Sequence, residues 1–313
     1  MSENELVERL LSGNKRALAR VISKIEGEDA EVPAIFSEIY PRTGEAVTVG
    51  FTGPPGVGKS SIIARLIELY RSEDKKVGVV SVDPSSPFTK GAILGDRIRL
   101  ADHFLDKDVF IRSMGSRGHL GGLAGASRLA GLAMEAYGMD VVLYETVGVG
   151  QGEVEVASAA DTVILCLQPG AGDSVQALKA GVMEIADIIC INKVDHPQAN
   201  GTASEVRSIL EIGHELDPEA PTPPIVMTRG DNGDGVEELK EKIWKHREFL
   251  RESGRMKERH LASIREFILS WNTNKMEKEM QERLDKEDAE LIEKVRKREL
   301  DPISAAETLY KEV

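Results

Sequence analysis

The chain has 313 residues and a formal net charge of −13, with 41% hydrophobic and 30% charged residues. This composition is typical of a globular protein. The negative charge argues against a general nucleic-acid binder. No stretch approaches the roughly 20 apolar residues of a membrane span. The acidic start lacks the basic and apolar order of a secretory signal and the Arg-rich character of a transit peptide, so we expect a cytoplasmic protein.

The first 45 residues predict a helical N-terminal extension. Leu6, Leu10 and Leu11 recur at helical spacing among charged residues, and Leu18 begins a second series of this kind. Pro33 suits the first turn of a third short helix, because proline is tolerated at that position.

Residues 46–254 alternate between short apolar runs and amphipathic segments. The runs predict strands near 47–52, 77–82, 109–112, 141–145, 162–167, 188–192 and 225–228. The segments predict helices near 59–72, 122–137, 203–215 and 235–253. Strands that alternate with helices form βαβ units, so we expect an α/β fold with a doubly wound, mostly parallel sheet covered on both faces.

After residue 254 the strand pattern stops, and residues 255–313 predict a C-terminal helical arm. An apolar stripe that includes Phe267 and Trp271 precedes a highly charged stretch. Asp301 resembles an N-cap, with Pro302 at the first position of a last helix. Helices this charged cover little core alone, so we expect the arm to pack against a neighbour or another subunit.

The sequence contains two cysteines, Cys166 and Cys190. Each lies within an apolar run. This setting favours small buried side chains in a reducing compartment over a disulfide or a metal pair.

The segment Gly53-Pro-Pro-Gly-Val-Gly-Lys-Ser60 matches the phosphate-binding pattern G-x-x-x-x-G-K-[ST] at every position, between a predicted strand and a predicted helix. Its glycines let backbone N–H groups turn towards the β- and γ-phosphates of a nucleotide, and Lys59 would reach the same oxygens. The Ser60 hydroxyl would bind Mg²⁺. We therefore expect a P-loop NTPase, with nucleotide-binding residues Gly53, Pro54, Pro55, Gly56, Val57, Gly58, Lys59, Ser60 and Ser61.

The segment Asn192-Lys-Val-Asp195 follows a later predicted strand and indicates which base is bound. An aspartate there can accept two hydrogen bonds from N1–H and the exocyclic amine of guanine, whereas adenine would leave the carboxylate unpaired. The stem of Lys193 would lie along the base, and Asn192 would tie loops together. Thr228, Arg229 and Gly230 follow the next strand and could supply backbone contacts to the base.

Carboxylates at the ends of two predicted strands are candidate magnesium ligands. Asp83 ends the second strand and Glu145 the fourth, and strand ends of this kind converge on the ligand crevice. Their oxygens suit Mg²⁺, directly or through its waters. Asp96, in the intervening segment, is a third candidate. We therefore expect Ser60, Asp83, Asp96 and Glu145 to serve the metal.

Further glycine-rich segments follow other predicted strands. Glu145-Thr-Val-Gly148 stands where common GTPases carry Asp-x-x-Gly, so the Gly148 amide could contact the γ-phosphate and sense hydrolysis. Gln151 could orient water, although a merely polar role also fits. Arg117 could stabilise transferred phosphate, meet a partner or be a simple surface charge, and His119 fits a packed or exposed role better than a ligand.

Together these motifs resemble the methylmalonyl-CoA mutase-associated GTPases, which include bacterial MeaB and ArgK proteins, archaeal relatives and the human mitochondrial counterpart. The resemblance extends over nearly the whole chain. The segments that carry it are Gly53–Ser61, Asp83-Pro-Ser-Ser-Pro, Gly91-x-Ile-Leu-Gly-Asp-Arg97, Arg112-Ser-Met-Gly-Ser-Arg-Gly118 and Glu145-Thr-Val-Gly-Val-Gly-Gln151.

The resemblance implies a G3E-class GTPase that is a chaperone of an adenosylcobalamin-dependent acyl-CoA mutase, such as methylmalonyl-CoA mutase. In this family GTP or GDP and Mg²⁺ gate cofactor loading and protect or reactivate the mutase, which holds the cobalamin. A homodimer through the terminal helices is also implied, with no nucleic-acid or membrane partner. Lys179 falls in the family's third switch and is linked to activation by the mutase, which gives the catalytic set Lys59, Asp83, Asp96, Glu145 and Lys179.

Other functions remain open from the sequence. A nickel metallochaperone of the same GTPase class would need surface Cys or His clusters, and only six histidines are present. A phosphotransferase would fit the older transport-kinase label of some relatives, although the guanine-type motif argues against an ATPase. A scaffold could bind GTP without hydrolysing it.

Overall fold

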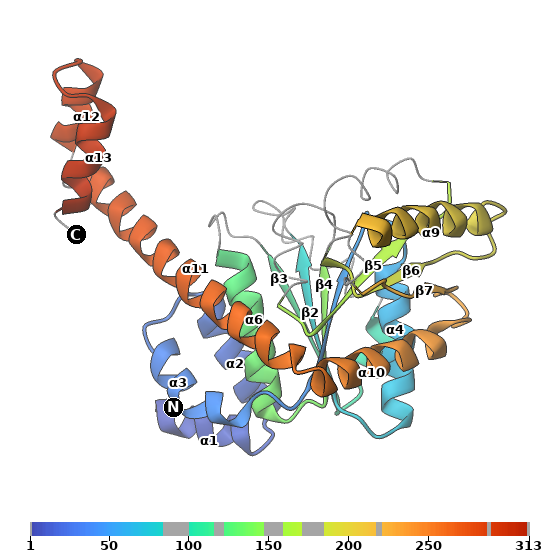
Figure 1. The fold of residues 1–313 in the computed structure, drawn as a ribbon. Helices are drawn as coiled ribbons and strands as arrows, with labels where there is room; N and C mark the ends of the chain where they lie inside the picture. The colour runs from blue at the N-terminus through green and yellow to red at the C-terminus, as the bar shows by residue number, and fades with distance from the viewer. Residues whose placement is uncertain are drawn as a thin grey trace.

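The structure is a computed structural model that describes residues 2–83, 100–115, 122–146, 159–170, 185–216, 221–286 and 289–311. Its strands are β1 (Val47–Thr52), β2 (Val77–Asp83), β3 (Val109–Gly115), β4 (Val141–Thr146), β5 (Thr162–Leu167), β6 (Ile188–Ile191) and β7 (Ile225–Met227). They form one sheet in the order β3-β2-β4-β1-β5-β6-β7, and every pair in it is parallel (Figure 1). The predicted doubly wound parallel sheet is confirmed.

Helices cover both faces of this sheet. One face packs against α4 (Lys59–Ser72) and α10 (Val236–Glu252). On the other face, α6 (Gly122–Tyr137) covers β2 and β4, and α9 (Ala199–Leu216) covers β5 and β6. The central strands are buried throughout because both faces are covered, which explains their continuous apolar runs.

The N-terminal helices enlarge the core on the α6 side of the sheet. These are α1 (Glu3–Leu11), α2 (Lys15–Glu26) and α3 (Val32–Ile39), followed by the short 3-10 helix η1 (Tyr40–Arg42). Their apolar stripes join α6 and the same face of β2 and β4 in one buried cluster. A second 3-10 helix, η2 (Ala101–His103), precedes β3.

Two elements, β3 and α9, extend by more than one residue beyond their predicted bounds. β3 continues to Gly115, because Ser113–Gly115 pair with Ser81–Asp83 of β2 although their composition is typical of a loop. α9 begins at Ala199, four residues before the predicted start at 203. Its first turn carries little of the apolar stripe, so hydrophobic periodicity alone places the start too late.

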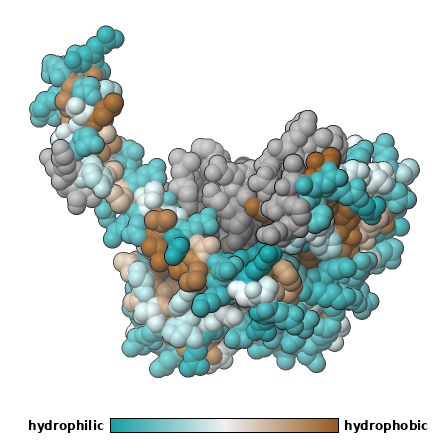
Figure 2. Space-filling model, viewed as in Figure 1, coloured by the Kyte–Doolittle hydropathy of each residue, from teal (hydrophilic) through white to brown (hydrophobic). Residues whose placement is uncertain are grey.

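The C-terminal arm consists of α11 (Arg255–Lys286), α12 (Ala289–Arg296) and α13 (Pro302–Lys311), and it leads away from the body (Figure 1). The predicted cap of α13 is present, since Asp301 Oδ1 accepts hydrogen bonds from the N–H groups of Ile303 and Ser304. Apolar side chains gather on α11 where it leaves the body (Figure 2), including the exposed Ile268 and Trp271. In the part of the chain that the structure describes, no helix is both long and apolar enough to cross a membrane.

Candidate nucleotide site

The P-loop, residues 53–58, connects the end of β1 to the start of α4 at the carboxyl edge of the sheet. Gly53 has φ +135°, and a Cβ atom on it would lie 2.2 Å from the carbonyl oxygen of Cys166 in β5. Gly58 has φ +97°, and its Cβ would lie 2.2 Å from the side-chain nitrogen of Asn192. Only glycine fits these two positions, so the neighbouring segments fix the path of the loop.

Backbone donors of this loop are available to an anion. Gly58 caps α4 without a side chain, and α4 is a 14-residue helix whose first turn carries no acidic residue. Among the residues that the structure describes, none accepts a hydrogen bond from the N–H groups of Gly56, Val57 or Gly58. Donors of this kind at a helix N-terminus attract phosphate.

Lys59 places its ammonium group inside the same loop. The residue is 6% exposed, and its Nζ donates to the carbonyl oxygen of Gly53 at 2.5 Å and to that of Pro54 at 3.0 Å. These carbonyl oxygens hold a buried cation where the loop turns. A phosphate oxygen that replaced them would meet a cation already in position, which favours binding.

Ser60 and Glu145 form the polar contact beside the P-loop. Glu145 is the last residue but one of β4, next to β1, and the Ser60 hydroxyl donates to its Oε1 at 2.5 Å. Both residues are buried, with 4% exposure each. A hydroxyl and a carboxylate are hard oxygen ligands, so this pair fits Mg²⁺ chemically.

Other predicted site residues are placed only in part. Asp83 ends β2 at the same edge of the sheet, and only its backbone is described. Ser61 follows Ser60 in the first turn of α4. Asp96, Gly148 and Lys179 lie outside the described residues, as do Arg117, His119 and Gln151.

Asn192, directly after β6, joins three parts of the site. Its Nδ2 donates to the carbonyl oxygen of Val57 at 2.7 Å. Its Oδ1 accepts from the Gly230 N–H at 2.9 Å and from the Thr228 hydroxyl at 3.2 Å. The residue is 3% exposed. This side chain therefore ties the P-loop to both segments of the predicted base site.

Lys193 and Asp195 lie at the surface beside these contacts. Lys193 has φ +60°, and its Nζ donates to the carbonyl oxygen of Gly56 at 2.9 Å and to the Gln168 side chain. The Asp195 side chain is 55% exposed, and its Oδ1 lies 3.8 Å from Nε of Arg229. An exposed carboxylate in this place can accept two hydrogen bonds from a guanine base.

The segment 228–230 uses its backbone donors within the protein. The N–H groups of Thr228 and Arg229 donate to the carbonyl oxygens of Ile191 and Asp234, and that of Gly230 donates to Asn192. In this arrangement, a contact from the segment to a base would use carbonyl oxygens or the Arg229 side chain. The sequence pattern had pointed to the backbone without showing that its N–H groups are occupied.

Two residues take part in the site although the sequence did not place them in the nucleotide-binding set. Gln168, directly after β5, contacts Lys193, and its place at a strand end was the available signal. Cys166 packs its backbone against Gly53. Cys166 and its strand neighbour Cys190 are free and fully buried, as predicted. A hydrogen bond with Cys190 and burial raise the pKa of the Cys166 thiol.

Comparison with known families decides which class of P-loop protein this is. The family described as methylmalonyl Co-A mutase-associated GTPase MeaB matches residues 15–285. The chain belongs to the MeaB family. With this match, the resemblance expected from the motifs is confirmed.

Relatives support the same membership. A protein of Pyrococcus abyssi (strain GE5 / Orsay) that bears a GTPase name is 46% identical over 312 residues, which are 99% of this chain and 96% of that protein. The methylmalonic aciduria type A homolog, mitochondrial, of Caenorhabditis briggsae is 31% identical over 85% of this chain and 68% of its own length. A crystal structure titled LAO/AO transport system kinase has a TM-score of 0.69 and 27% identity, covering 99% of this chain and 96% of that one. This MeaB-family chain is a P-loop GTPase.

Proposed function

We propose that this GTPase is a chaperone of an adenosylcobalamin-dependent acyl-CoA mutase, and that the mutase is methylmalonyl-CoA mutase. The observation that carries the proposal is the match over residues 15–285 to a family described by its association with that mutase. The name of the Caenorhabditis briggsae relative points to the same area of metabolism. Guanine nucleotide then gates cofactor loading and protects or reactivates the mutase, which itself holds the cobalamin.

The described residues support a particular placement of GTP or GDP in the site. The P-loop N–H groups and Lys59 bind the β- and γ-phosphates, and Lys59 exchanges the carbonyl oxygens of Gly53 and Pro54 for phosphate oxygens. Asp195 accepts from guanine, and the stem of Lys193 lies along the base. Asn192 holds the P-loop and the base-binding segments in a fixed position relative to each other.

Ser60 and Glu145 hold Mg²⁺ in this proposal, together with Asp83 and Asp96. When bound, the ion supplies charge neutralisation at the β- and γ-phosphates. Glu145 would hold the ion directly or through its waters, and the burial of Ser60 and Glu145 would keep bulk water from competing. Gly148 and Lys179 take the roles of a γ-phosphate sensor and of a residue linked to activation by the mutase.

The reaction is hydrolysis of GTP. The oxygen of a water molecule attacks the γ-phosphorus, the bond from that phosphorus to the bridging oxygen breaks, and GDP and phosphate leave. Lys59 and the P-loop N–H groups stabilise the charge that develops on the phosphate oxygens. Basal turnover is slow and rises with the mutase, and the biological output is the change of conformation between the GTP and GDP states.

The organisation of the chain completes the proposal. Residues 1–45 form an N-terminal helical extension, 46–254 the GTPase domain and 255–313 a dimerisation arm. The exposed apolar side chains of α11, among them Leu261 and Leu269, support a surface that a second copy covers. We place the protein in the cytoplasm.

Association with the mutase tests this function directly. Purified protein is mixed with methylmalonyl-CoA mutase and examined by sedimentation velocity in GDP or a non-hydrolysable GTP analogue, each with Mg²⁺. We expect a complex whose affinity depends on the nucleotide, together with nucleotide-dependent transfer of adenosylcobalamin into the apo-mutase. The proposal fails if no complex forms in either nucleotide state and cofactor loading is the same with and without this protein.

A further inference from the structure

The base of α11 is attached to the residues that immediately precede β5 and β6. Arg259 donates to the two carboxylate oxygens of Asp187, at 2.5 Å and 2.8 Å, and to the carbonyl oxygen of Asp161 at 2.7 Å. Nε2 of His260 lies 2.8 Å from Oδ1 of Asp161. Asp161 precedes β5 and Asp187 precedes β6. Two consecutive side chains of the arm therefore hold the starts of two adjacent strands.

Asp187 is the buried centre of this attachment, with 8% of its side chain exposed. Its Oδ1 lies 3.3 Å from Nε2 of His246 in α10, and its Oδ2 accepts from the N–H of Val163 in β5. Burial alone would raise the pKa of Asp187, but the hydrogen bonds from Arg259 and His246 outweigh burial and hold the pKa below its usual value. The carboxylate therefore stays charged and keeps its partners in place.

The other ends of the same two strands form part of the nucleotide site. The carbonyl oxygen of Cys166, near the end of β5, packs against Gly53 of the P-loop. Asn192 and Lys193 follow β6 directly. β5 has six residues, so about 20 Å of strand, at about 3.3 Å per residue, separates the attachment from the nucleotide site. The strands pair in register from Ile164 with Ile188 to Leu167 with Ile191, and can transmit a shift as a unit.

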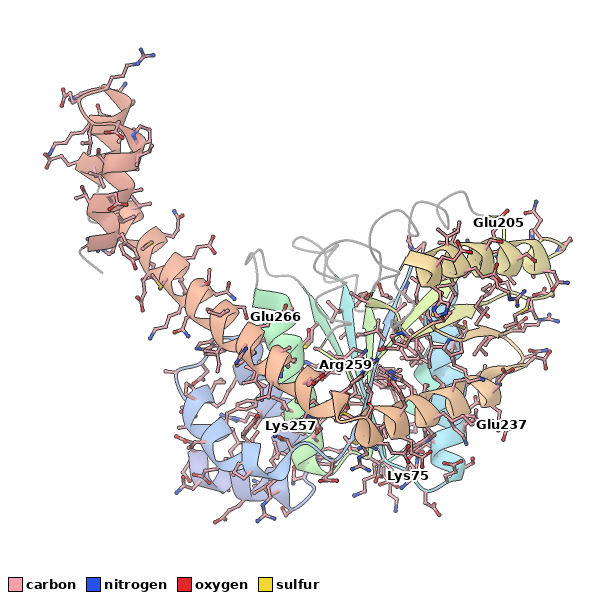
Figure 3. The ribbon with its side chains drawn as sticks, viewed as in Figure 1. Lys75, Glu205, Glu237, Lys257, Arg259 and Glu266 are labelled. Atoms are coloured by element: carbon pink, nitrogen blue, oxygen red, sulfur yellow. The ribbon has the colours of Figure 1, made fainter. Side chains whose placement is uncertain are left out.

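A second attachment ties α11 to α6. Arg128 donates to the carbonyl oxygen of Ser263 at 2.5 Å and to its hydroxyl, and its guanidinium lies 5.5 Å from the ring centre of Phe267. A cavity of about 300 Å³ lies between the two attachments, lined by residues of α6, α11 and the start of the sheet, Glu135 and Glu266 among them. Figure 3 shows Arg259 and Glu266 on the stretch of α11 that lies over these elements. The cavity leaves room for the base of the arm to shift.

We infer that Arg259 and His260 are positioning residues that couple the arm to nucleotide binding through β5 and β6. A molecule that binds the arm and displaces it also displaces Asp161 and Asp187, and so shifts the segment Asn192–Asp195 relative to the P-loop. By linkage, nucleotide binding at the far ends of the strands must change the stability of the contacts at the base of the arm. The free energy of this change equals that by which a shift of the arm changes nucleotide binding. The identity of the molecule that binds the arm rests on the proposed mutase function. The coupling between the arm and the nucleotide site does not depend on that function.

Hydrogen exchange at the base of the arm tests the coupling without a partner. Amides of residues 258–264 are followed by mass spectrometry in the nucleotide-free and GDP-bound full-length protein. GDP is expected to slow their exchange by about fivefold or more, the lower end of typical coupling. The variants are Arg259→Gln, Arg259→Lys and, as a matched control, Lys257→Gln. Lys257 is exposed on the same stretch of α11 (Figure 3), and its side chain has no partner among the described residues.

The slowing should persist in Lys257→Gln and disappear in Arg259→Gln, while GDP affinity stays within about threefold of wild type. Arg259→Lys keeps the charge opposite Asp187 but lacks the planar fork whose two nitrogens contact both carboxylate oxygens, so it should fold and show reduced slowing. This variant decides the matter if Arg259→Gln does not fold. The inference is overturned if GDP leaves the exchange of wild-type residues 258–264 unchanged, or slows it equally in the Arg259 variants.

The mutase is then added in the same assay to separate the two proposals. If GDP slows exchange as described but saturating mutase leaves GDP dissociation unchanged, the coupling stands and the proposed partner fails. If the mutase changes GDP dissociation equally in wild type and Arg259→Lys, the partner stands and the coupling through Arg259 fails.

Discussion

The side-chain amide of Asn192 donates to the carbonyl oxygen of Val57 at 2.7 Å and thereby joins the base-recognition segment to the P-loop. The oxygen of the same amide accepts from Gly230 and Thr228. Because all three partners meet at one buried side chain, a shift of the base subsite changes the contacts of the phosphate subsite. Nucleotide affinity is therefore a property of the two subsites together.

Replacing Asn192 with alanine should weaken GDP binding by tenfold or more. The Gly230 N–H and the Val57 carbonyl lose their partner in the buried part of the site, at about 1–3 kcal/mol for each group left unpaired. Titration with a fluorescent GDP measures the loss, and thermal unfolding reports the accompanying destabilisation. Asn200→Ala, at an exposed position in α9, is the control and should behave like wild type. Equal GDP affinity in the two variants would refute this role of Asn192.

Asp195→Asn should change the preferred base. The asparagine retains one acceptor and replaces the other with a donor, which matches N1–H and the C2 carbonyl of xanthine instead of the two donors of guanine. We expect GDP affinity to fall about 100-fold and xanthosine diphosphate to become the better ligand. Competition binding with GDP, xanthosine diphosphate and ADP measures this. Asp231→Asn, on the neighbouring loop, should keep the wild-type order, and a wild-type order in Asp195→Asn would contradict the assignment.

Gly53→Ala and Gly201→Ala should have different effects on stability. Residue 53 has φ +135°, and its Cβ would lie 2.2 Å from a backbone oxygen. Among the described residues outside the backbone of α9 itself, no atom lies within 4 Å of a Cβ built at residue 201. Forcing the backbone of the P-loop to move should cost about 2 kcal/mol or more, while alanine in α9 is neutral or stabilises by up to about 1 kcal/mol. Urea unfolding gives both values. A Gly53→Ala protein as stable as wild type would show that the loop is less constrained than the contacts indicate.

Glu135 should make stability depend on pH. Burial raises the pKa of this carboxyl to about 7, above its ordinary value of 4.5. Between these values the native state binds more protons than the unfolded chain, so the free energy of unfolding falls as the pH rises. Glu135→Gln removes this fall and keeps an acceptor for the Gly44 N–H, so the variant should exceed wild type by about 1–3 kcal/mol at about pH 8.

Urea unfolding from about pH 5 to about pH 8 checks this expectation. Glu205→Gln, at an exposed carboxylate on α9 (Figure 3), should reproduce the wild-type profile. The same pH slope in Glu135→Gln as in wild type would assign the fall to other groups. His260 lines the same cavity, and its hydrogen bond with Asp161 raises its pKa, so its contribution to stability is also lost as the pH rises.

Local patterns were sufficient to predict the fold and the position of the P-loop. The run from Val47 to Thr52, the glycines that follow and the amphipathic stretch after Lys59 are contiguous, so one stretch of sequence contains strand, loop and helix. The end of a buried strand likewise located Asn192 and Glu145, because parallel strands end at the same edge. The sequence predicted that Ser60 and Glu145 both serve the same magnesium site, but it did not predict the hydrogen bond between them.

The contacts that hold the arm could not be predicted in this way. Arg259 and Asp187 are separated by 72 residues, and each lies in a stretch where a surface charge is the ordinary explanation. Their pairing depends on where α11 crosses the starts of β5 and β6, which only tertiary packing sets. The contact of Gln168 with Lys193 was also not predictable from local patterns, because it follows from the order of the strands and not from a motif.

Steady-state release of phosphate from GTP, with Mg²⁺ and with or without purified adenosylcobalamin-dependent methylmalonyl-CoA mutase, tests the account most directly. We predict slow turnover by the protein alone, a clear acceleration at saturating mutase, and loss of both in Lys59→Ala, because Lys59 is the cation inside the P-loop. Turnover that saturating mutase leaves unchanged, or no magnesium-dependent release in either condition, would contradict the account.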